Sequence, residues 1–171
     1  NSSSPTLDNC TFTDNTADNY GGGMANSYSN PTLTNCTIIG NASNYSGGGM
    51  YNNESNPTLT NCTFTNNTAT TGDGGGMFND YSNPTLTDTT VCGNTPDQII
   101  GDWTDKGGNT IADECPIDCP DITGDGIINV SDLLNIIDQW GATNSPADVN
   151  SDGIVDVSDL LIVVGNWGPC N

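Results

Sequence analysis

Two segments near the C-terminus, Asp121 to Asp132 and Asp148 to Asp159, have the residue pattern of a twelve-residue calcium loop. Calcium takes roughly six to eight oxygen ligands, and glycine at position 6 lets alternate residues converge on one ion. We therefore expect two bound calcium ions. The expected ligands, with a backbone carbonyl at position 7, are Asp121, Thr123, Asp125, Ile127, Asn129 and Asp132 in the first loop and Asp148, Asn150, Asp152, Ile154, Asp156 and Asp159 in the second.

An apolar run with helical spacing follows each loop and ends in Trp-Gly. Pro120 and Pro146 lie just before the loops, so the leading helix of an EF-hand is missing. Duplicated loop–helix units 27 residues apart resemble the dockerin module over about residues 119–170. The resemblance implies a cohesin-like protein as partner, with loop positions 10 and 11 shaping specificity. These positions hold Val130 and Ser131, and Val157 and Ser158.

The two loops are similar but not identical. Because the Val-Ser pair occurs in both, a module with pseudo-two-fold symmetry can present it to one partner in either of two orientations. At position 3 the first loop has Thr123, where an acid or an amide is usual. A hydroxyl is a weaker and uncharged ligand, so the first loop is expected to bind calcium less tightly than the second.

The charge of the chain is strongly negative. Its 171 residues include 21 carboxylates, one basic residue, Lys106, and no histidine, giving a net charge of −20. A nucleic-acid partner is not expected, because no cluster of cations exists to replace the counterions of a phosphate backbone. A histidine-dependent catalytic triad is excluded for the same compositional reason, and no membrane span is expected.

The first hundred residues are built from repeats. Pro-Thr-Leu recurs at residues 5–7, 31–33, 57–59 and 84–86, and Gly-Gly-Gly-Met at 21–24, 47–50 and 74–77. Short Thr/apolar alternations are typical of strands, and Asn and Gly clusters are typical of turns. Three or four strands per repeat predict about four coils of a parallel β-solenoid, in which like residues stack in columns. The expected columns are Leu7, Leu33, Leu59 and Leu86; Phe12, Ile38 and Phe64; Met24, Met50 and Met77; and an amide ladder of Asn9, Asn35 and Asn61.

This repeat pattern resembles right-handed parallel β-helix proteins of the pectate-lyase-like superfamily, particularly the Gly-Gly-Met repeats of bacterial surface and secreted proteins. The resemblance covers about residues 1–100. We therefore expect a mainly β chain, with a right-handed parallel β-helix of about four coils followed by a small α-helical, calcium-binding, dockerin-like domain. The expected boundaries are 1–110 for the β-helix, 111–118 for a linker and 119–171 for the dockerin-like domain.

Enzymatic activity is not expected. Proteins of this fold include lyases, hydrolases and adhesins, so the fold does not choose a function. A hydrolase needs two carboxylates separated by about 5 to 10 Å. Asp8 and Asp88 belong to the first and fourth coils, and three coil spacings place them about 14 Å apart.

The cysteines fall into two groups. Cys10, Cys36 and Cys62 form one further column. Strands about 4.8 Å apart are wider than the preferred Cβ separation of about 3.8 Å in a disulfide, so we expect buried free thiols there. Two disulfides are expected, one closing the ends of the dockerin-like domain and one pinning the segment after the last repeat: Cys119 with Cys170, and Cys92 with Cys115.

Disulfides and calcium loops favour an extracellular protein, secreted or associated with the cell surface. The first coil would expose Leu7 and Phe12, which upstream residues or a second copy docked head-to-tail would cover. We therefore expect an extracellular structural protein. In this protein, a rigid solenoid is linked to its partner through a calcium-dependent docking module, and the chain is expected to be a subunit of a head-to-tail fibre. Its partner would be another copy of the chain or a cohesin-like protein.

The alternative function is a secreted protein that binds or degrades polysaccharides and is anchored by its dockerin-like domain to a cohesin-type receptor. Exposed tyrosines can stack on sugars, but they can equally pack against the turns of a solenoid. The candidates for contact with a glycan are Tyr20, Tyr28, Tyr45, Tyr51 and Tyr81.

Overall fold

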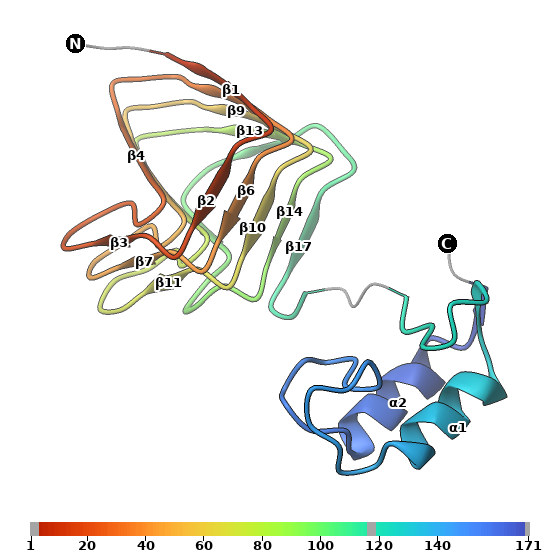
Figure 1. Ribbon diagram of the computed structural model, residues 1–171. Coiled ribbons are helices and arrows are strands. Elements are labelled where there is room, and N and C mark those ends of the chain that lie inside the picture. Colours follow the sequence, from red (N-terminus) through yellow and green to blue (C-terminus); the bar gives the residue numbers. More distant parts are fainter. Residues whose placement is uncertain (1–3, 116–118, 170–171) are drawn as a thin grey trace. The chain divides into compact units, whose positions relative to one another are not determined.

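The computed structural model describes residues 4–115 and 119–169. The chain divides into two compact units, residues 1–116 and 117–171. The first unit is a parallel β-solenoid of about four coils, and the second contains two short helices (Figure 1).

Successive coils place their strands side by side in four parallel sheets. The first sheet contains β1 (Thr6–Asp8), β5 (Thr32–Thr34), β9 (Thr58–Thr60), β13 (Thr85–Thr87) and β16 (Thr104–Asp105). The second contains β2 (Thr11–Thr13), β6 (Thr37–Ile39), β10 (Thr63–Thr65), β14 (Thr90–Cys92) and β17 (Thr110–Ala112). The third contains β3 (Thr16–Ala17), β7 (Ala42–Ser43) and β11 (Thr68–Ala69). The fourth contains β4 (Met24–Ser27), β8 (Met50–Asn53), β12 (Met77–Asp80) and β15 (Ile99–Ile100).

The strand register places equivalent residues of neighbouring coils opposite one another, which confirms the predicted apolar columns. Their members are Leu7, Leu33, Leu59 and Leu86; Phe12, Ile38 and Phe64; and Met24, Met50 and Met77. The inner members are fully buried and form one core, whereas Leu7, Phe12 and Met24 of the first coil are partly buried. Threonine flanks the apolar residue in most of these strands because its branched side chain suits the pleated, half-exposed surface.

The Gly-Gly-Gly-Met repeat forms the corner that leads into β4, β8 and β12. Gly47 has φ = 70°, a backbone conformation that favours glycine because it lacks a Cβ atom. At Gly48 the backbones of two coils approach so closely that a Cβ atom would lie 2.5 Å from the carbonyl carbon of Thr68. The glycines therefore allow the coils to stack at this corner.

A column of buried amides, which the sequence analysis did not find, runs alongside the apolar core. The Asn67 Nδ2 donates to Asn94 Oδ1 in the next coil at 2.9 Å and to the Ile38 carbonyl in the previous coil at 2.9 Å. The Asn67 Oδ1 accepts from the backbone N–H and the Nδ2 of Asn41 at 2.9 and 3.0 Å. Asn15 extends this column, and Asn26, Asn52 and Asn79 form a second one.

The amide ladder expected at Asn9, Asn35 and Asn61 is present only in part. The Asn61 Nδ2 donates to Asn35 Oδ1 at 2.7 Å, but the Asn35 Nδ2 then donates to Asp8 Oδ1 at 3.2 Å. All three asparagines have positive φ, between 50° and 53°, a conformation that asparagine tolerates better than most residues. These asparagines lie at an exposed corner, where their main role is to form the turn, not to line the interior.

The last coil is shorter than the others and is joined to the coil before it by a disulfide. Its strands β15, β16 and β17 pair with β12, β13 and β14. Ile111 and Ala112, which the sequence analysis assigns to the linker, lie in β17 opposite Val91 and Cys92. Cys92 forms a disulfide with Cys115, as predicted.

Cys10, Cys36 and Cys62 are free thiols, as predicted, but only Cys36 and Cys62 are buried, and Cys10 is partly exposed. The distance argument behind that prediction is wrong. Cys92 and Cys115 belong to neighbouring coils and form a disulfide with their Cα atoms 4.8 Å apart, so the spacing of the coils does not prevent such bonds. The predicted pairing of Cys119 with Cys170 lies outside the described residues.

In the second unit, each loop leads directly into a helix, as the apolar runs predicted. Helix α1 spans Val130–Asp138 and helix α2 spans Val157–Gly165. The helices pack on each other over a small core that includes Ile136 and Val163. Strand β18 (Ile127–Ile128) pairs antiparallel with β19 (Gly168–Pro169), which brings the first loop and the end of the unit together. Neither described helix has the length and apolar character needed to cross a membrane.

We predict that Asn67→Ala destabilises the solenoid by about 3 kcal/mol, because buried polar groups that lose their partners cost about 1–3 kcal/mol each. The Asn41 N–H and the Ile38 carbonyl would both lose a partner. Urea unfolding followed by circular dichroism measures the effect. The matched control is Asn30→Ala, which also removes a bond between coils but at an exposed position. An equal loss from both substitutions would contradict a special role for the buried ladder.

Candidate functional site

The first loop folds around the Asp121 carboxylate. Its oxygens accept hydrogen bonds from the backbone N–H groups of Gly124 and Gly126 at 2.7 and 2.6 Å. The Thr123 hydroxyl lies within hydrogen-bond distance of both Asp121 Oδ1, at 3.1 Å, and Asp132 Oδ1, at 3.0 Å. Residues at positions 1, 3 and 12 of the loop therefore meet, although they are up to 11 positions apart in the sequence.

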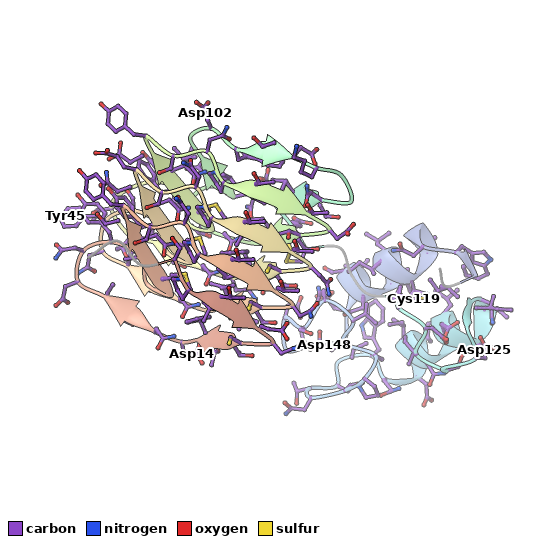
Figure 2. All side chains as sticks on the ribbon, turned by 90° about the horizontal axis from the view of Figure 1, so that it is seen from above. Asp14, Tyr45, Asp102, Cys119, Asp125 and Asp148 are labelled. Atoms are coloured by element: carbon purple, nitrogen blue, oxygen red, sulfur yellow. A yellow bond between two sulfur atoms is a disulfide. The ribbon has the colours of Figure 1, made fainter. Side chains whose placement is uncertain are left out.

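The other predicted ligands of this loop also contact one another. The Asn129 Nδ2 donates to Asp125 Oδ2 at 3.2 Å and to the Ile127 carbonyl oxygen at 3.0 Å. Positions 5, 7 and 9 thus form a second group of oxygen-bearing residues. Asp125 is labelled in Figure 2, together with Asp148, the first residue of the second loop.

The second loop repeats this arrangement. The Asp148 Oδ2 accepts from the Gly153 N–H at 2.9 Å, and the Asn150 Nδ2 donates to Asp152 Oδ2 at 2.9 Å. Asp159 Oδ1 accepts from the backbone N–H groups of Val149 and Asn150 at 2.8 and 3.2 Å. Both loops therefore close on the aspartate at position 12.

Positions 9 and 12 of each loop also start the following helix. Asn129 caps α1 by accepting from the Ser131 N–H, and Asp132 accepts from the Asn129 N–H in return. Asp156 and Asp159 form the same reciprocal pair at α2. Such a capping box satisfies N–H groups that a helix start otherwise leaves without partners. The loop and the helix therefore form a single folding element.

The position-12 aspartates are fully buried. Burial acts to raise the pKa of the Asp132 carboxyl, but hydrogen bonds from the backbone N–H groups of Asn129 and Thr123 outweigh it and hold the pKa below its ordinary value. Residues 119–171 contain no lysine, arginine or histidine. Buried carboxylates are normally paired with a cation or bound to a metal, so oxygen-rich loops of this kind suit a hard divalent ion.

Within the described ranges 4–115 and 119–169, no three Asp, Glu, His or Cys side chains are gathered into a metal cluster. In both loops the carboxylates point at backbone N–H groups instead of at one another. The side chains that could hold an ion are therefore mixed: carboxylates, the Thr123 hydroxyl in the first loop and the Asn150 amide in the second.

Each helix leaves one row of large apolar side chains exposed. The row begins at loop position 10 and continues four, seven and ten residues later, and all its members are between 47 and 62 % exposed. The members are Val130, Leu134, Ile137 and Trp140 at α1, and Val157, Leu161, Val164 and Trp167 at α2. Contiguous exposed apolar residues are uncommon on soluble monomers and mark interaction surfaces. We call these rows the apolar stripes.

The predicted partner residues Val130, Ser131, Val157 and Ser158 are all exposed at the first turns of the two helices. The remaining members of the stripes were missed as candidate binding residues. Their signal was present in the sequence, because the runs Leu133-Leu134 and Ile136-Ile137 place apolar residues on two faces of one short helix. Only one of these faces can pack on a single neighbouring helix.

A family model described as a right handed beta helix region matches residues 1–131, which is more than half of the chain. The chain belongs to the right-handed β-helix family. The match extends through most of the first loop. No curated protein and no solved structure shows a significant match to the chain.

On the β-helix, most of the candidate glycan-binding tyrosines contact neighbouring side chains. The rings of Tyr20 and Tyr51 stack with centroids 4.6 Å apart, and Tyr51 and Phe78 stack with centroids 5.8 Å apart. Tyr45 projects from the outside of the β-helix (Figure 2). The centroids of the Tyr45 and Tyr20 rings are 5.7 Å apart. When two aromatic rings stack, each covers part of the face of the other, which reduces the ring area that a sugar can contact.

Some acids of the β-helix accept hydrogen bonds from neighbouring coils. Glu54 accepts from the Tyr28 hydroxyl at 2.8 Å, and this bond raises the pKa of Tyr28. Asp80 accepts from the Asn53 amide at 2.9 Å. These carboxylates thus take part in the bonds that join one coil to the next.

We predict two calcium-binding events of different strength, with the first loop weaker by on the order of tenfold, because the Thr123 hydroxyl is a weaker ligand than the Asn150 amide at the same position of the second loop. Isothermal titration calorimetry of the metal-free protein measures both. Thr123→Asn should make the two affinities similar, and the reciprocal Asn150→Thr should weaken the second loop. Equal affinities in the native protein, or no response to either exchange, would show that position 3 does not set the difference.

Proposed function

We propose that the chain is an extracellular structural protein, in which the β-helix is a rigid rod and the two-helix unit is a calcium-dependent docking module of the dockerin type. The observation that carries this proposal is the duplication of the apolar stripe. Each stripe begins inside a loop with calcium-ligand spacing, at Val130 or Val157, and is the same length on both helices. A surface repeated in this way suits recognition of a partner more than packing of the module itself.

Calcium would stabilise the module by holding each loop closed. The position-12 carboxylates Asp132 and Asp159 are buried at the starts of the helices without a basic residue in the module. An ion bound there would compensate buried negative charge and fix the helix start at the same time. The module core is small, with five fully or almost fully buried apolar residues. A small core of this kind commonly requires a metal or a disulfide for stability.

The charge of the module favours a different protein as the occupant of the stripes. Residues 119–171 contain eight aspartates and no basic residue, and the whole chain carries a net charge of −20. Two copies of the chain would bring like charges together, which costs free energy unless cations intervene. We therefore propose a cohesin-like protein whose apolar surface is bordered by lysine or arginine, with a second copy as the competing occupant.

An extracellular location is supported by the disulfide between Cys92 and Cys115. Disulfides persist in oxidising compartments and are rare in the cytosol. Loops that use uncharged ligands such as Thr123 and Asn150 suit the high calcium concentrations found outside cells.

Chelation of calcium is predicted to unfold residues 119–171 and to leave the β-helix folded. A ligand that binds only the folded state adds about 2.7 kcal/mol at a hundredfold excess over its Kd, which is a large part of the stability of so small a unit. Hydrogen exchange with and without a chelator measures this segment by segment. Unchanged protection of α1 and α2 after chelation would contradict a stabilising role of calcium.

Docking is tested by surface plasmon resonance with a panel of purified cohesin-type domains as the probe. Native protein should bind at least one of them in millimolar calcium and lose the interaction in chelator. The double substitution Leu134→Asp and Leu161→Asp should weaken binding by about 30-fold or more, the factor for an anchor residue worth about 2 kcal/mol. The control pair Thr143→Asp and Asn144→Asp adds the same two charges at exposed positions outside the stripes and should bind like the native protein.

Sedimentation velocity of the native protein in calcium tests whether a second copy of the chain, instead of a cohesin-like protein, occupies the stripes. Monomeric protein that binds a cohesin-type domain supports the proposal. Calcium-dependent self-association that Leu134→Asp and Leu161→Asp abolish, without binding to any cohesin-type domain, would assign the stripes to a second copy and to a fibre.

A further inference from the structure

The three free cysteines of the β-helix form a single column at the corner between the first and second sheets. Each cysteine immediately precedes the first residue of a strand: Cys10 precedes β2, Cys36 precedes β6 and Cys62 precedes β10. The first residues of these three strands pair with one another across the coils. Cys10 is partly exposed, whereas Cys36 and Cys62 are each 1 % exposed. The column therefore connects the surface of the first coil to the interior.

The thiols of this column point toward the preceding coil. The Cys36 Sγ donates to the Thr34 carbonyl at 3.2 Å and lies 3.7 Å from the Leu7 carbonyl oxygen of the first coil. The Cys62 Sγ makes the same pair of contacts with Thr60 and Leu33, at 3.4 and 3.6 Å. Each inner thiol thus contacts the backbone of the preceding coil, which carries the next cysteine of the column.

The fourth coil shows what this corner position requires. Thr89 occupies the place of the cysteines there, and its hydroxyl donates to the Thr87 carbonyl at 2.9 Å. A small side chain with one hydrogen-bond donor therefore satisfies the corner. Serine can replace any of the three cysteines without removing the local hydrogen bond. Serine variants are therefore suitable for testing the reactivity of each thiol.

The spacing of the coils permits a bond between neighbouring cysteines. Cys92 and Cys115 form a disulfide between adjacent coils with a Cα–Cα distance of 4.8 Å. Neighbouring strands in the column are about the same distance apart, within the range of about 4.4–6.8 Å seen for disulfides. The geometry used by one pair in this β-helix is therefore available to the free cysteines.

We propose that the column is a thiol–disulfide exchange site, in which Cys10 reacts with a small-molecule disulfide and Cys36 resolves the product into a disulfide between the first two coils. The Cys10 thiolate attacks one sulfur of the small disulfide, and the leaving thiolate takes up the proton that Cys10 lost. The Cys36 thiolate then attacks the Cys10 Sγ and displaces the second small thiol, which takes up the proton from Cys36. Two protein thiols are oxidised, and one small disulfide is reduced to two thiols.

The third cysteine lies at the closed end of the column. Burial raises the pKa of the Cys62 thiol, and the neighbouring Cys36 thiol raises it further, whereas backbone hydrogen bonds act in the opposite direction. A thiol with a raised pKa is a poor nucleophile at neutral pH. Cys62 also lies two coils from Cys10, with Cys36 between them, so exchange that enters at Cys10 is resolved by Cys36 and Cys62 stays reduced.

The experiment incubates the folded chain with oxidised glutathione at neutral pH, followed by intact mass spectrometry and peptide mapping of the three column cysteines. The native protein is expected to form a Cys10–Cys36 disulfide without keeping glutathione. Cys36→Ser is expected to keep one glutathione on Cys10, because the resolving thiol is absent. Cys10→Ser should not react in the column, and Cys62→Ser should behave like the native protein.

Circular dichroism of each serine variant controls for folding. Stable glutathione on Cys10 of the native protein would overturn the proposal by showing a solitary surface thiol. Complete lack of reaction in both the native protein and Cys36→Ser would overturn it by showing that Cys10 is not reachable. A disulfide that joins Cys36 to Cys62 while Cys10 remains reduced would overturn the assignment of Cys10 as the entry point.

Discussion

The β-helix depends on the in-register stacking of one coil on the next, which places each residue beside its own equivalent. Backbone hydrogen bonds between coils fix this register, as in the bond from the Thr63 N–H to the Cys36 carbonyl at 2.9 Å. The constraint is severe, because a side chain chosen at one position meets a similar side chain above and below it. Apolar residues then form a continuous core. Polar residues inside the coil must be able to form hydrogen bonds with a residue of the same type in the next coil.

Asparagine meets this requirement where an acid or a base would not. Its amide both donates and accepts, so Asn41, Asn67 and Asn94 continue one chain of hydrogen bonds through the interior. Carboxylates in the same column would repel one another and lack donors. Each acid within residues 4–115 is consequently exposed or partly exposed, as at Asp8, and the interior of this part of the solenoid is neutral.

The two-helix unit is organised by a different constraint, in which a few residues have several roles. Asp132 closes the first loop, contacts Thr123 and completes the N-terminal cap of α1. Two short helices offer one face each to the core they share, so apolar residues on the other face remain in solvent. The exposed stripes are thus a direct result of pairing very apolar helices in a unit too small to cover them.

The sequence by itself determined the coil interval, the apolar columns and the order of loop and helix, because each follows from local spacing or from repetition of like residues. The Cys92–Cys115 disulfide could be predicted because these cysteines lie outside the repeated cysteine column and flank the segment after the last repeat. Only the tertiary structure decided which asparagines form the interior ladder, since Asn61 and Asn67 lie six residues apart in the same coil, yet Asn61 is exposed and Asn67 is buried. It also decided that Leu134 remains exposed while Ile136 is buried. Periodicity does not choose between two apolar faces of one helix, and the packing of α1 on α2 does.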